Sequence, residues 1–260
     1  MQISRYRLSH SDLRLKIAIL ADIHDYPIHK ARRAVMAENP DLILIPGDII
    51  TGHISKAAWY SDDRAWTDEF GITHKKSAWK PPKNAAEIFE QLSSVAPTYF
   101  SLGNHEHLWQ DADVSFVESL GVHVLDNRYE RIGDSLVIGG LSSAQACGLE
   151  RIADPKPNTE WLSKFDAEKG YKILLMHEPQ LWSEYIEGKR IDLTVSGHVH
   201  GGQWRVFGQG IFAPGQGFFP ELSKGFYYEN RLLISAGLAN TAPVPRFFNP
   251  TELVILSIGE

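Results

Sequence analysis

The stretch LKIAILADIHDYPIHKARRAVMAENPDLILIPGD, residues 15–48, decides the fold class of this chain. It begins with an apolar run at Leu15–Ala21, which is typical of a strand buried on both faces. A polar loop then leads into His29–Asn39, whose composition favours a helix, and Asp41–Ile45 is a second apolar run. Strand, helix and strand in this order predict a βαβ unit with a right-handed crossover, and therefore an α/β protein.

The same rhythm continues along the chain and by itself favours a single sheet in a single domain, residues 1–260. Helices are expected at Asn84–Val95, Asp113–Leu120 and Asn158–Lys169, the last with Asn158 or Thr159 near its N-cap. Strands are expected at Ile3–Leu8 (an edge strand), Thr98–Leu102, Val122–Leu125, Ser135–Leu141, Tyr171–Met176, Asp192–Val195, Leu232–Ser235 and Leu253–Leu256, with a Gly- and Pro-rich loop between His200 and Asn230.

Residues 52–84 interrupt this rhythm. The segment contains Trp59, Trp66 and Trp79 among charged residues and has no clear period. Long loops inside compact domains are usually functional or disordered, and this many aromatic residues argue against disorder. We expect an ordered insertion beside the functional site, which could stack on a nucleobase, cover an acyl chain or simply pack on the core.

The composition excludes several classes of protein. Among 260 residues there is one cysteine, Cys147, which rules out an intrachain disulfide and cysteine-rich zinc or iron–sulfur sites. The formal net charge of −6 does not favour binding to nucleic acid. No apolar run approaches the roughly 20 residues that span a bilayer, and the N-terminus lacks a signal-peptide pattern. A cytoplasmic protein is the default expectation.

Polar clusters follow five of the apolar runs: Asp22/His24, Asp48, Asn104/His105, His177 and His198/His200. Ligands of open α/β sheets gather beyond the carboxyl ends of the strands. In extended backbone, the side chains of His198 and His200 would point the same way and reach one small target. Oxygen and nitrogen ligands without sulfur suit Mn²⁺, Fe, Zn²⁺ or Co²⁺.

Each cluster also has a purely structural interpretation. Asp22 and Asp48 could cap helices, Asn104 could serve a turn, and His177 could be an ordinary near-surface histidine. Five such clusters at five strand ends favour a metal site.

The motifs Asp22-Ile23-His24, Gly47-Asp48, Gly103-Asn104-His105-Glu106, His177 and Gly197-His198-Val199-His200 together resemble the signature of the calcineurin-like metallophosphoesterases, from about Leu15 to His200. The GGQ at 201–203 and the later segments 236–238, 245–247 and 252–253 resemble a bacterial branch with membrane-associated phosphoesterases and some UDP-2,3-diacylglucosamine hydrolases. The resemblance implies a four-layer α/β sandwich, in which helices flank two mixed β-sheets.

The resemblance also implies a dinuclear metal centre with two divalent ions. Manganese is the favoured metal, and Fe, Zn or Co are alternatives. One ion would be held by Asp22, His24, Asp48 and His200, and the other by Asp48, Asn104, His177 and His198. Asp48 would bridge both, and a metal-bridging hydroxide would attack phosphorus. His105 would lie just outside the metals as a catalytic group that contacts the substrate. Asp25, Glu106 or backbone carbonyls would orient the ligand imidazoles.

The sequence says less about the substrate than about the metal ligands. Protein phosphatases of this superfamily carry arginines where this chain has Leu102 and the run Ile49-Ile50-Thr51, so a small phosphodiester or pyrophosphate is favoured over a phosphate monoester. His53, His107 and Arg246 are candidate substrate contacts. The two histidines need no such role if they are ordinary surface loop residues, which is the favoured interpretation, and Arg246 could equally be a structural arginine that pairs with a carboxylate.

Two rival functions remain open. One is a nucleotide–lipid pyrophosphatase of the UDP-diacylglucosamine type with peripheral membrane contact, and the other is a non-catalytic metal-binding scaffold. Neither requires an obligate protein partner.

Overall fold

The computed structural model describes residues 1–51, 66–67, 73–74, 83–106, 109, 111–144, 156–242 and 244–259. The predictions for His53, His107, Cys147, Trp59 and Trp79 lie outside these residues. Within the region 52–84, the backbone of β4 (Trp66–Thr67) pairs antiparallel with β5 (Thr73–His74).

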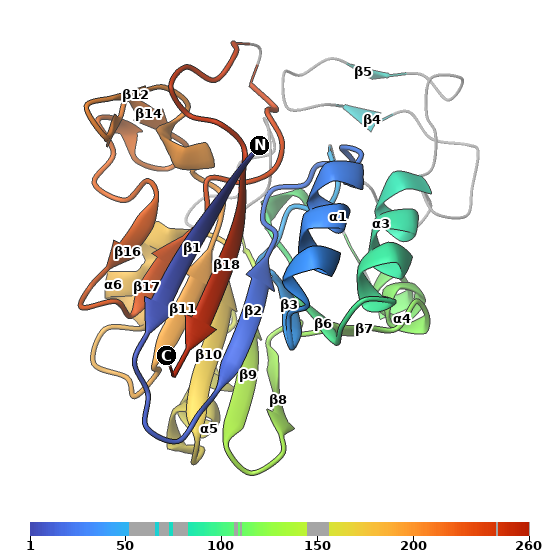
Figure 1. Cartoon of the computed structure of the whole chain (residues 1–260), viewed down its shortest axis with the longest axis vertical. Helices are drawn as coiled ribbons and strands as arrows, with labels where there is room; N and C mark the ends of the chain where they lie inside the picture. Colours follow the sequence, from blue (N-terminus) through green and yellow to red (C-terminus); the bar gives the residue numbers. More distant parts are fainter. Residues whose placement is uncertain are drawn as a thin grey trace.

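Half of the fold is a mixed six-stranded sheet whose strand order is β1-β18-β2-β3-β6-β7 (Figure 1). Strands β2, β3, β6 and β7 run parallel, while β18 pairs antiparallel with β2 and carries β1 at the edge. The strands are β1 (Gln2–Leu8), β2 (Leu15–Ile19), β3 (Leu42–Ile45), β6 (Thr98–Phe100), β7 (Val122–Val124) and β18 (Glu252–Ile258).

The other half is a second mixed six-stranded sheet, in the order β16-β17-β11-β10-β9-β8. Its four central strands run parallel, and an antiparallel strand closes each edge. The strands are β8 (Arg128–Ile132), β9 (Leu136–Leu141), β10 (Tyr171–Met176), β11 (Leu193–Ser196), β16 (Gly225–Tyr227) and β17 (Leu232–Ile234).

Alternate residues of the strands divide between two apolar layers. Ile17 and Ile19 of β2 join Ile173 and Leu175 of β10 in the layer between the sheets. Their neighbours in sequence, such as Ala18, face outward and pack under helices. A strand buried on both faces must be apolar throughout, which explains the unbroken apolar runs in the sequence.

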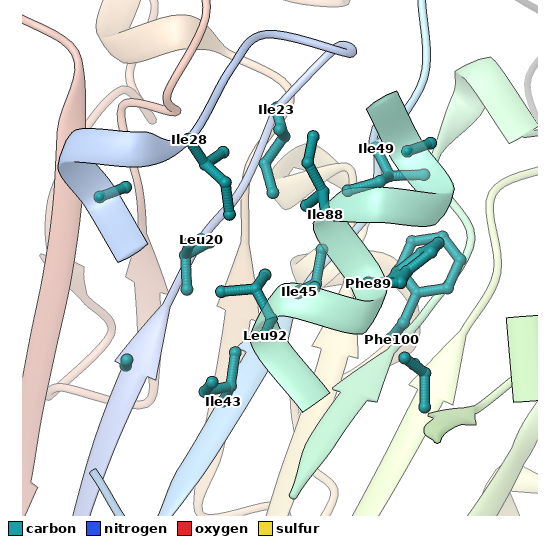
Figure 2. Packing of buried hydrophobic residues seen from close by; sticks show 14 of the residues in the cluster. Leu20, Ile23, Ile28, Ile43, Ile45, Ile49, Ile88, Phe89, Leu92 and Phe100 are labelled. Atoms are coloured by element: carbon teal, nitrogen blue, oxygen red, sulfur yellow. The ribbon is translucent and has the colours of Figure 1, made fainter. Parts of the chain in front are cut away.

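Helices cover both outer faces. Figure 2 shows Ile88, Phe89 and Leu92 of α3 packed over Ile45 and Phe100 of the first sheet. Helices α1 (His29–Glu38), α3 (Lys83–Ser93) and α4 (Asp111–Ser119) cover this sheet, and α5 (Leu162–Ala167) and α6 (Trp182–Tyr185) cover the second. The four-layer sandwich of two mixed sheets is confirmed. The single sheet suggested by strand–helix alternation is wrong, because two sheets built from the same βαβ unit produce the same alternation.

Some local predictions need correction. The helix expected at Asn158–Lys169 spans only Leu162–Ala167, because Asn158 accepts a hydrogen bond from the Glu160 N–H in a turn that precedes the helix. The segment expected as a loop after His200 contains two ribbons, β12 (Arg205–Val206) with β13 (Gln209–Gly210) and β14 (Phe212–Ala213) with β15 (Gly217–Phe218). Edge strands β8 and β16 were also not predicted. Among the helices that the structure describes, none is both long and apolar enough to cross a bilayer.

Candidate metal centre

The loops that follow the parallel strands of the two sheets meet at one end of the sandwich. Backbone hydrogen bonds join the loops after β2 and β3, from the Ile23 N–H to the Asp48 carbonyl at 2.8 Å. The loops after β10 and β11 are joined in the same way, from Gly197 to His177 at 3.1 Å. The Asp22 carboxylate then accepts a hydrogen bond from the His198 N–H at 2.9 Å, which connects the two sheets directly.

The backbone of these loops is held in a conformation that L-residues rarely adopt. The φ angles of Asp22, His24, Asp48, His198 and His200 lie between 46° and 69°. Such residues cost conformational energy and persist where the surrounding structure fixes them, most often at functional sites. The prediction that the HxH pair lies in extended backbone is therefore wrong. The strand has already ended at Ser196, and the two histidines converge from a tight turn.

Two glycines allow this approach of main chain to side chain. A Cβ at Gly103 would lie 2.2 Å from Asp48 Oδ1, and a Cβ at Gly197 would lie 2.6 Å from Asp22 Oδ2. Only glycine fits at either position without displacing a carboxylate of the site.

Three groups of side chains have ligand atoms within 4.8 Å of one another. The first contains Asp22, His24 and His200, and the second contains Asp48, His177 and His198. Asn104 belongs with the second, because its Oδ1 lies 3.0 Å from His198 Nδ1. A third group joins His24 and Asp48 to His105.

Asp48 lies where these groups meet. Its Oδ2 is 3.0 Å from His177 Nε2, 3.6 Å from His24 Nε2 and 3.9 Å from His105 Nε2. All seven residues of the two ligand sets expected from the sequence are thus close together, and six are buried; His200 is partly exposed.

Several buried polar atoms of the site have no hydrogen-bond partner among the described residues, namely Asp22 Oδ2, His24 Nε2 and His198 Nε2. Unsatisfied buried groups of this kind are costly, and a divalent cation bound by the carboxylate and imidazole atoms would satisfy them. The residues therefore fit the metal ions that the sequence implies.

The far nitrogens of two imidazoles contact main-chain carbonyls. His24 Nδ1 lies 3.0 Å from the carbonyl oxygen of Ile50, and His177 Nδ1 lies 2.8 Å from that of Pro46. This contact orients each ring with Nε2 toward the centre of the site. Of the three candidates for this task, the carbonyls are thus the ones in contact, whereas Asp25 accepts a hydrogen bond from the Thr51 N–H.

Glu106 has a different task. Its buried carboxylate accepts four main-chain hydrogen bonds, from Asp48, Ile49, Ile50 and Gly103, at 2.8 to 3.2 Å. Burial and the charge of Asp48 raise the pKa of Glu106, and the main-chain donors oppose this rise. Glu106 ties the loop after β3 to the loop after β6.

Burial and neighbouring charges shift the pKa values of the imidazoles in opposite directions. Burial lowers the pKa of His24 to about 4 and that of His200 to about 3, so both rings are neutral at pH 7. Burial also lowers the pKa of His177, but the neighbouring Asp48 carboxylate outweighs it and holds that pKa well above its usual value. In return, His177 and His105 outweigh the effect of burial on Asp48 and keep its pKa well below the usual range. Without metal, His177 and Asp48 form an ion pair.

Arg246 lies behind His200. Its guanidinium donates to the main-chain carbonyls of Ala236 and Ala239, and its Nη2 lies 2.9 Å from His200 Nδ1. Burial lowers the pKa of Arg246 to about 10. These contacts support the structural alternative for Arg246 more than direct contact with substrate.

One residue of the site was not expected from the sequence. Asn249 is buried and donates from Nδ2 to the His200 carbonyl at 2.7 Å and to the Gln203 carbonyl at 3.2 Å. It thereby fixes the turn that carries His200. Because it lies 49 residues from His200 in the chain, no local pattern pointed to it.

Comparison with known proteins agrees with this geometry. The family model described as calcineurin-like phosphoesterase matches residues 15–202. An uncharacterised metallophosphoesterase of Aquifex aeolicus is 26% identical over 99% of this chain and 92% of its own length. A second relative, from Campylobacter jejuni, is 26% identical over 94% of this chain, which spans only 59% of that protein.

A third relative, named as a transmembrane protein with metallophosphoesterase domain, comes from Bos taurus; it is 26% identical over 78% of this chain and 44% of its own length. Residues 15–202, which the family model matches, contain every motif whose side chains meet at the ends of the two sheets. The chain belongs to the calcineurin-like phosphoesterase family.

Proposed function

We propose that the chain is a phosphodiesterase that uses two divalent metal ions, and that manganese is the preferred metal. The observation that carries this proposal is the pair of ligand groups that meet at Asp48, together with buried carboxylate and imidazole atoms that have no other partner among the described residues. When bound, the two ions supply Lewis acidity that activates water and neutralises phosphoryl charge.

We assign the side chains to the two ligand sets as follows. Asp22, His24 and His200 serve one position and Asn104, His177 and His198 the other, while the two oxygens of Asp48 allow it to serve both. His105 lies within reach of Asp48 and edge-on to His24, with ring centroids 4.6 Å apart. We infer that His105 contacts the phosphoryl group and donates a proton to the leaving oxygen.

The preference for a diester rests on what surrounds the centre. Ile49, Ile50 and Leu102, at the positions where protein phosphatases of the superfamily have arginines, are buried in the apolar cluster over the first sheet. The guanidinium of Arg246 is already bound to main-chain carbonyls. A diester carries less negative charge than a monoester and requires fewer cations to hold it.

A lipid-linked pyrophosphate is the second candidate. The bovine relative is named as a transmembrane protein, and the exposed aromatic residues Trp204 and Phe207 of this chain follow His200 closely in sequence. A location in the cytoplasm stays a prediction for either candidate.

The test is elemental analysis of the purified protein, combined with hydrolysis of bis-p-nitrophenyl phosphate and p-nitrophenyl phosphate with and without Mn²⁺. We expect about two metal ions per chain and faster hydrolysis of the diester. Asp48→Asn removes the shared ligand and should reduce hydrolysis to background while circular dichroism stays unchanged.

Metal without hydrolysis of either ester would favour the scaffold. Turnover at the wild-type rate by Asp48→Asn would contradict the assignment of a shared carboxylate.

A further inference from the structure

Exposed phenylalanines occur in the segments that follow the turn after β11 and in a loop that is bonded to those segments. They belong to the ribbons β12–β13 and β14–β15 and to the loop before β18. We call them the aromatic face: Phe207, Phe212, Phe218, Phe219, Phe247 and Phe248. Their exposed fractions range from 45% for Phe212 to 106% for Phe207, although the aromatic residues of this chain also fill its core. Exposed apolar groups of this size mark interaction sites.

The segments of the aromatic face are bound to one another. Trp204 pairs with Phe247 through the backbone, and its indole N–H donates to the Pro245 carbonyl at 2.8 Å. The Ile211 N–H donates to the Trp204 carbonyl at 2.8 Å, and the Phe219 N–H donates to Ile211 at the same distance. In Figure 1, β12 and β14 lie in one lobe above β16 and β17. The backbone segments that carry the rings therefore belong to one structural unit.

Three of the phenylalanines are unfavourable in water for two reasons: their rings are exposed, and their backbone has a positive φ angle. Phe207 occupies a two-residue hairpin turn between the paired residues Val206 and Gln209, with φ 49°. Phe219 and Phe248 have φ 55° and 50°. This backbone conformation favours Gly or Asn over a bulky side chain. Backbone strain of this kind persists where it serves a function, and exposed rings at such positions are therefore candidates for an interaction site.

The face carries almost no charge. Between residues 204 and 219 and between 244 and 248, the charged residues are Arg205 and Arg246. Arg205 donates to the carbonyls of Gly201 and Gly208, and Arg246 to those of Ala236 and Ala239. Neither guanidinium is presented to an anionic partner, so binding at this face depends on apolar contact alone.

We propose that the aromatic face inserts into the interface of a lipid bilayer. Rings on separate short ribbons and loops enter a fluid medium one by one and need no matching pocket, whereas a protein partner requires a complementary surface. Aromatic side chains are favoured at the level of lipid headgroups. Since Trp204 follows His200 by four residues, the docked protein holds its metal centre beside the membrane surface.

The test is flotation with vesicles of pure phosphatidylcholine, at low salt and at about 0.5 M salt. The wild-type chain should float under both conditions, because no charge is involved. The variant F207N/F219N/F248N should bind at least about tenfold more weakly. Asn tolerates the positive φ at all three positions, so the thermal midpoint of this variant should be equal to or above that of the wild type. The control is Met36→Gln on α1, a 51% exposed apolar residue away from the face, which should bind like the wild type.

Failure of the wild type to float would overturn the proposal. So would binding that requires anionic lipid and disappears at high salt, or self-association in sedimentation experiments that the triple variant abolishes without any vesicle binding. Flotation needs neither substrate nor turnover, so it is decided separately from the proposed esterase activity.

Discussion

The Asp48 carboxylate faces imidazoles that we assign to both ligand sets, His24 of one and His177 of the other. Its Oδ1 accepts a hydrogen bond from the His105 N–H at 3.1 Å, while its Oδ2 faces His24, His105 and His177. A carboxylate is the one side-chain group that offers two oxygens to two cations while its backbone stays fixed. A single aspartate can therefore serve both of the proposed ligand sets.

His105 is the residue whose role is most sharply testable. In His105→Ala, turnover of the diester should fall by about 10²–10⁴-fold, the usual contribution of an acid–base group. The two metal ions should remain bound, because neither proposed ligand set includes His105. Turnover and metal content are measured on the same sample, with His123→Ala as the control, since His123 lies in β7 and pairs with Glu130 at an exposed position. Loss of metal in His105→Ala would make His105 a ligand.

Metal binding should release a proton from His177. The raised pKa of His177 keeps its imidazole protonated at pH 7 without metal, and a metal ligand must be neutral. The affinity for Mn²⁺ should therefore rise with pH across the neutral range. Isothermal titration calorimetry at pH 7 in buffers of different ionisation enthalpy should report at least about one proton released per chain. Heats that do not depend on the buffer would contradict the His177–Asp48 ion pair.

At the scale of elements, the site consists of loops whose conformations are fixed by buried side chains. Each oxygen of Glu106 accepts two main-chain N–H groups, Oε1 from Ile49 and Ile50 and Oε2 from Asp48 and Gly103. Asn249 fixes the turn after β11 in the opposite sense, since its Nδ2 donates to the main-chain carbonyls of His200 and Gln203. The end of each strand determines where its ligand residues lie in the sandwich. The buried side chains of Glu106 and Asn249 then hold the backbone of the loops that carry these ligands.

Glu106→Gln tests this function of the loops. Replacing one oxygen by an NH₂ group turns two accepted hydrogen bonds into donor–donor contacts, so the variant should lose roughly 2–5 kcal/mol of stability. Chemical denaturation of the metal-free protein measures this loss, and the exposed Glu90→Gln on α3 should change stability by less than about 0.5 kcal/mol. Equal midpoints for the two variants would mean that Glu106 does not hold the loops.

The sequence predicts much of this element scale but not all of it. The strands β2, β3, β10 and β11 and the polar residues that follow them are readable, because a strand buried on both faces is apolar and its end is abrupt. The number of sheets is not readable from alternation, since Ile17 and Ala18 are equally apolar although they face different layers. Short edge strands such as β16, and distant contacts such as Asn249 with His200, depend on tertiary structure alone.

At the scale of the molecule, both halves of the sandwich contribute to the site. Four of the seven residues, Asp22, His24, Asp48 and Asn104, follow strands of the first sheet, and the three histidines at 177, 198 and 200 follow strands of the second. The ribbons of the aromatic face lie in the chain between β11 and β16 of the second sheet. The loop that carries Phe247 and Phe248 leads into β18 of the first sheet. A ligand at the centre therefore connects the two halves of the fold in addition to the apolar layer between the sheets and the hydrogen bond from the His198 N–H to Asp22.

Metal ions should consequently stabilise the whole protein rather than one loop. At a free Mn²⁺ concentration of about 100 times the dissociation constant, the native state gains about 2.7 kcal/mol. For a chain of this length that corresponds to a rise of roughly 5–10 °C in the thermal midpoint, seen as one transition because both sheets are held. Differential scanning calorimetry with Mn²⁺ and with a chelator measures the shift. Asp48→Asn, which removes the shared ligand, should show a much smaller rise. A metal-loaded wild-type protein that melts at the chelated midpoint, or in two separate transitions, would show that the ions do not hold the sheets together.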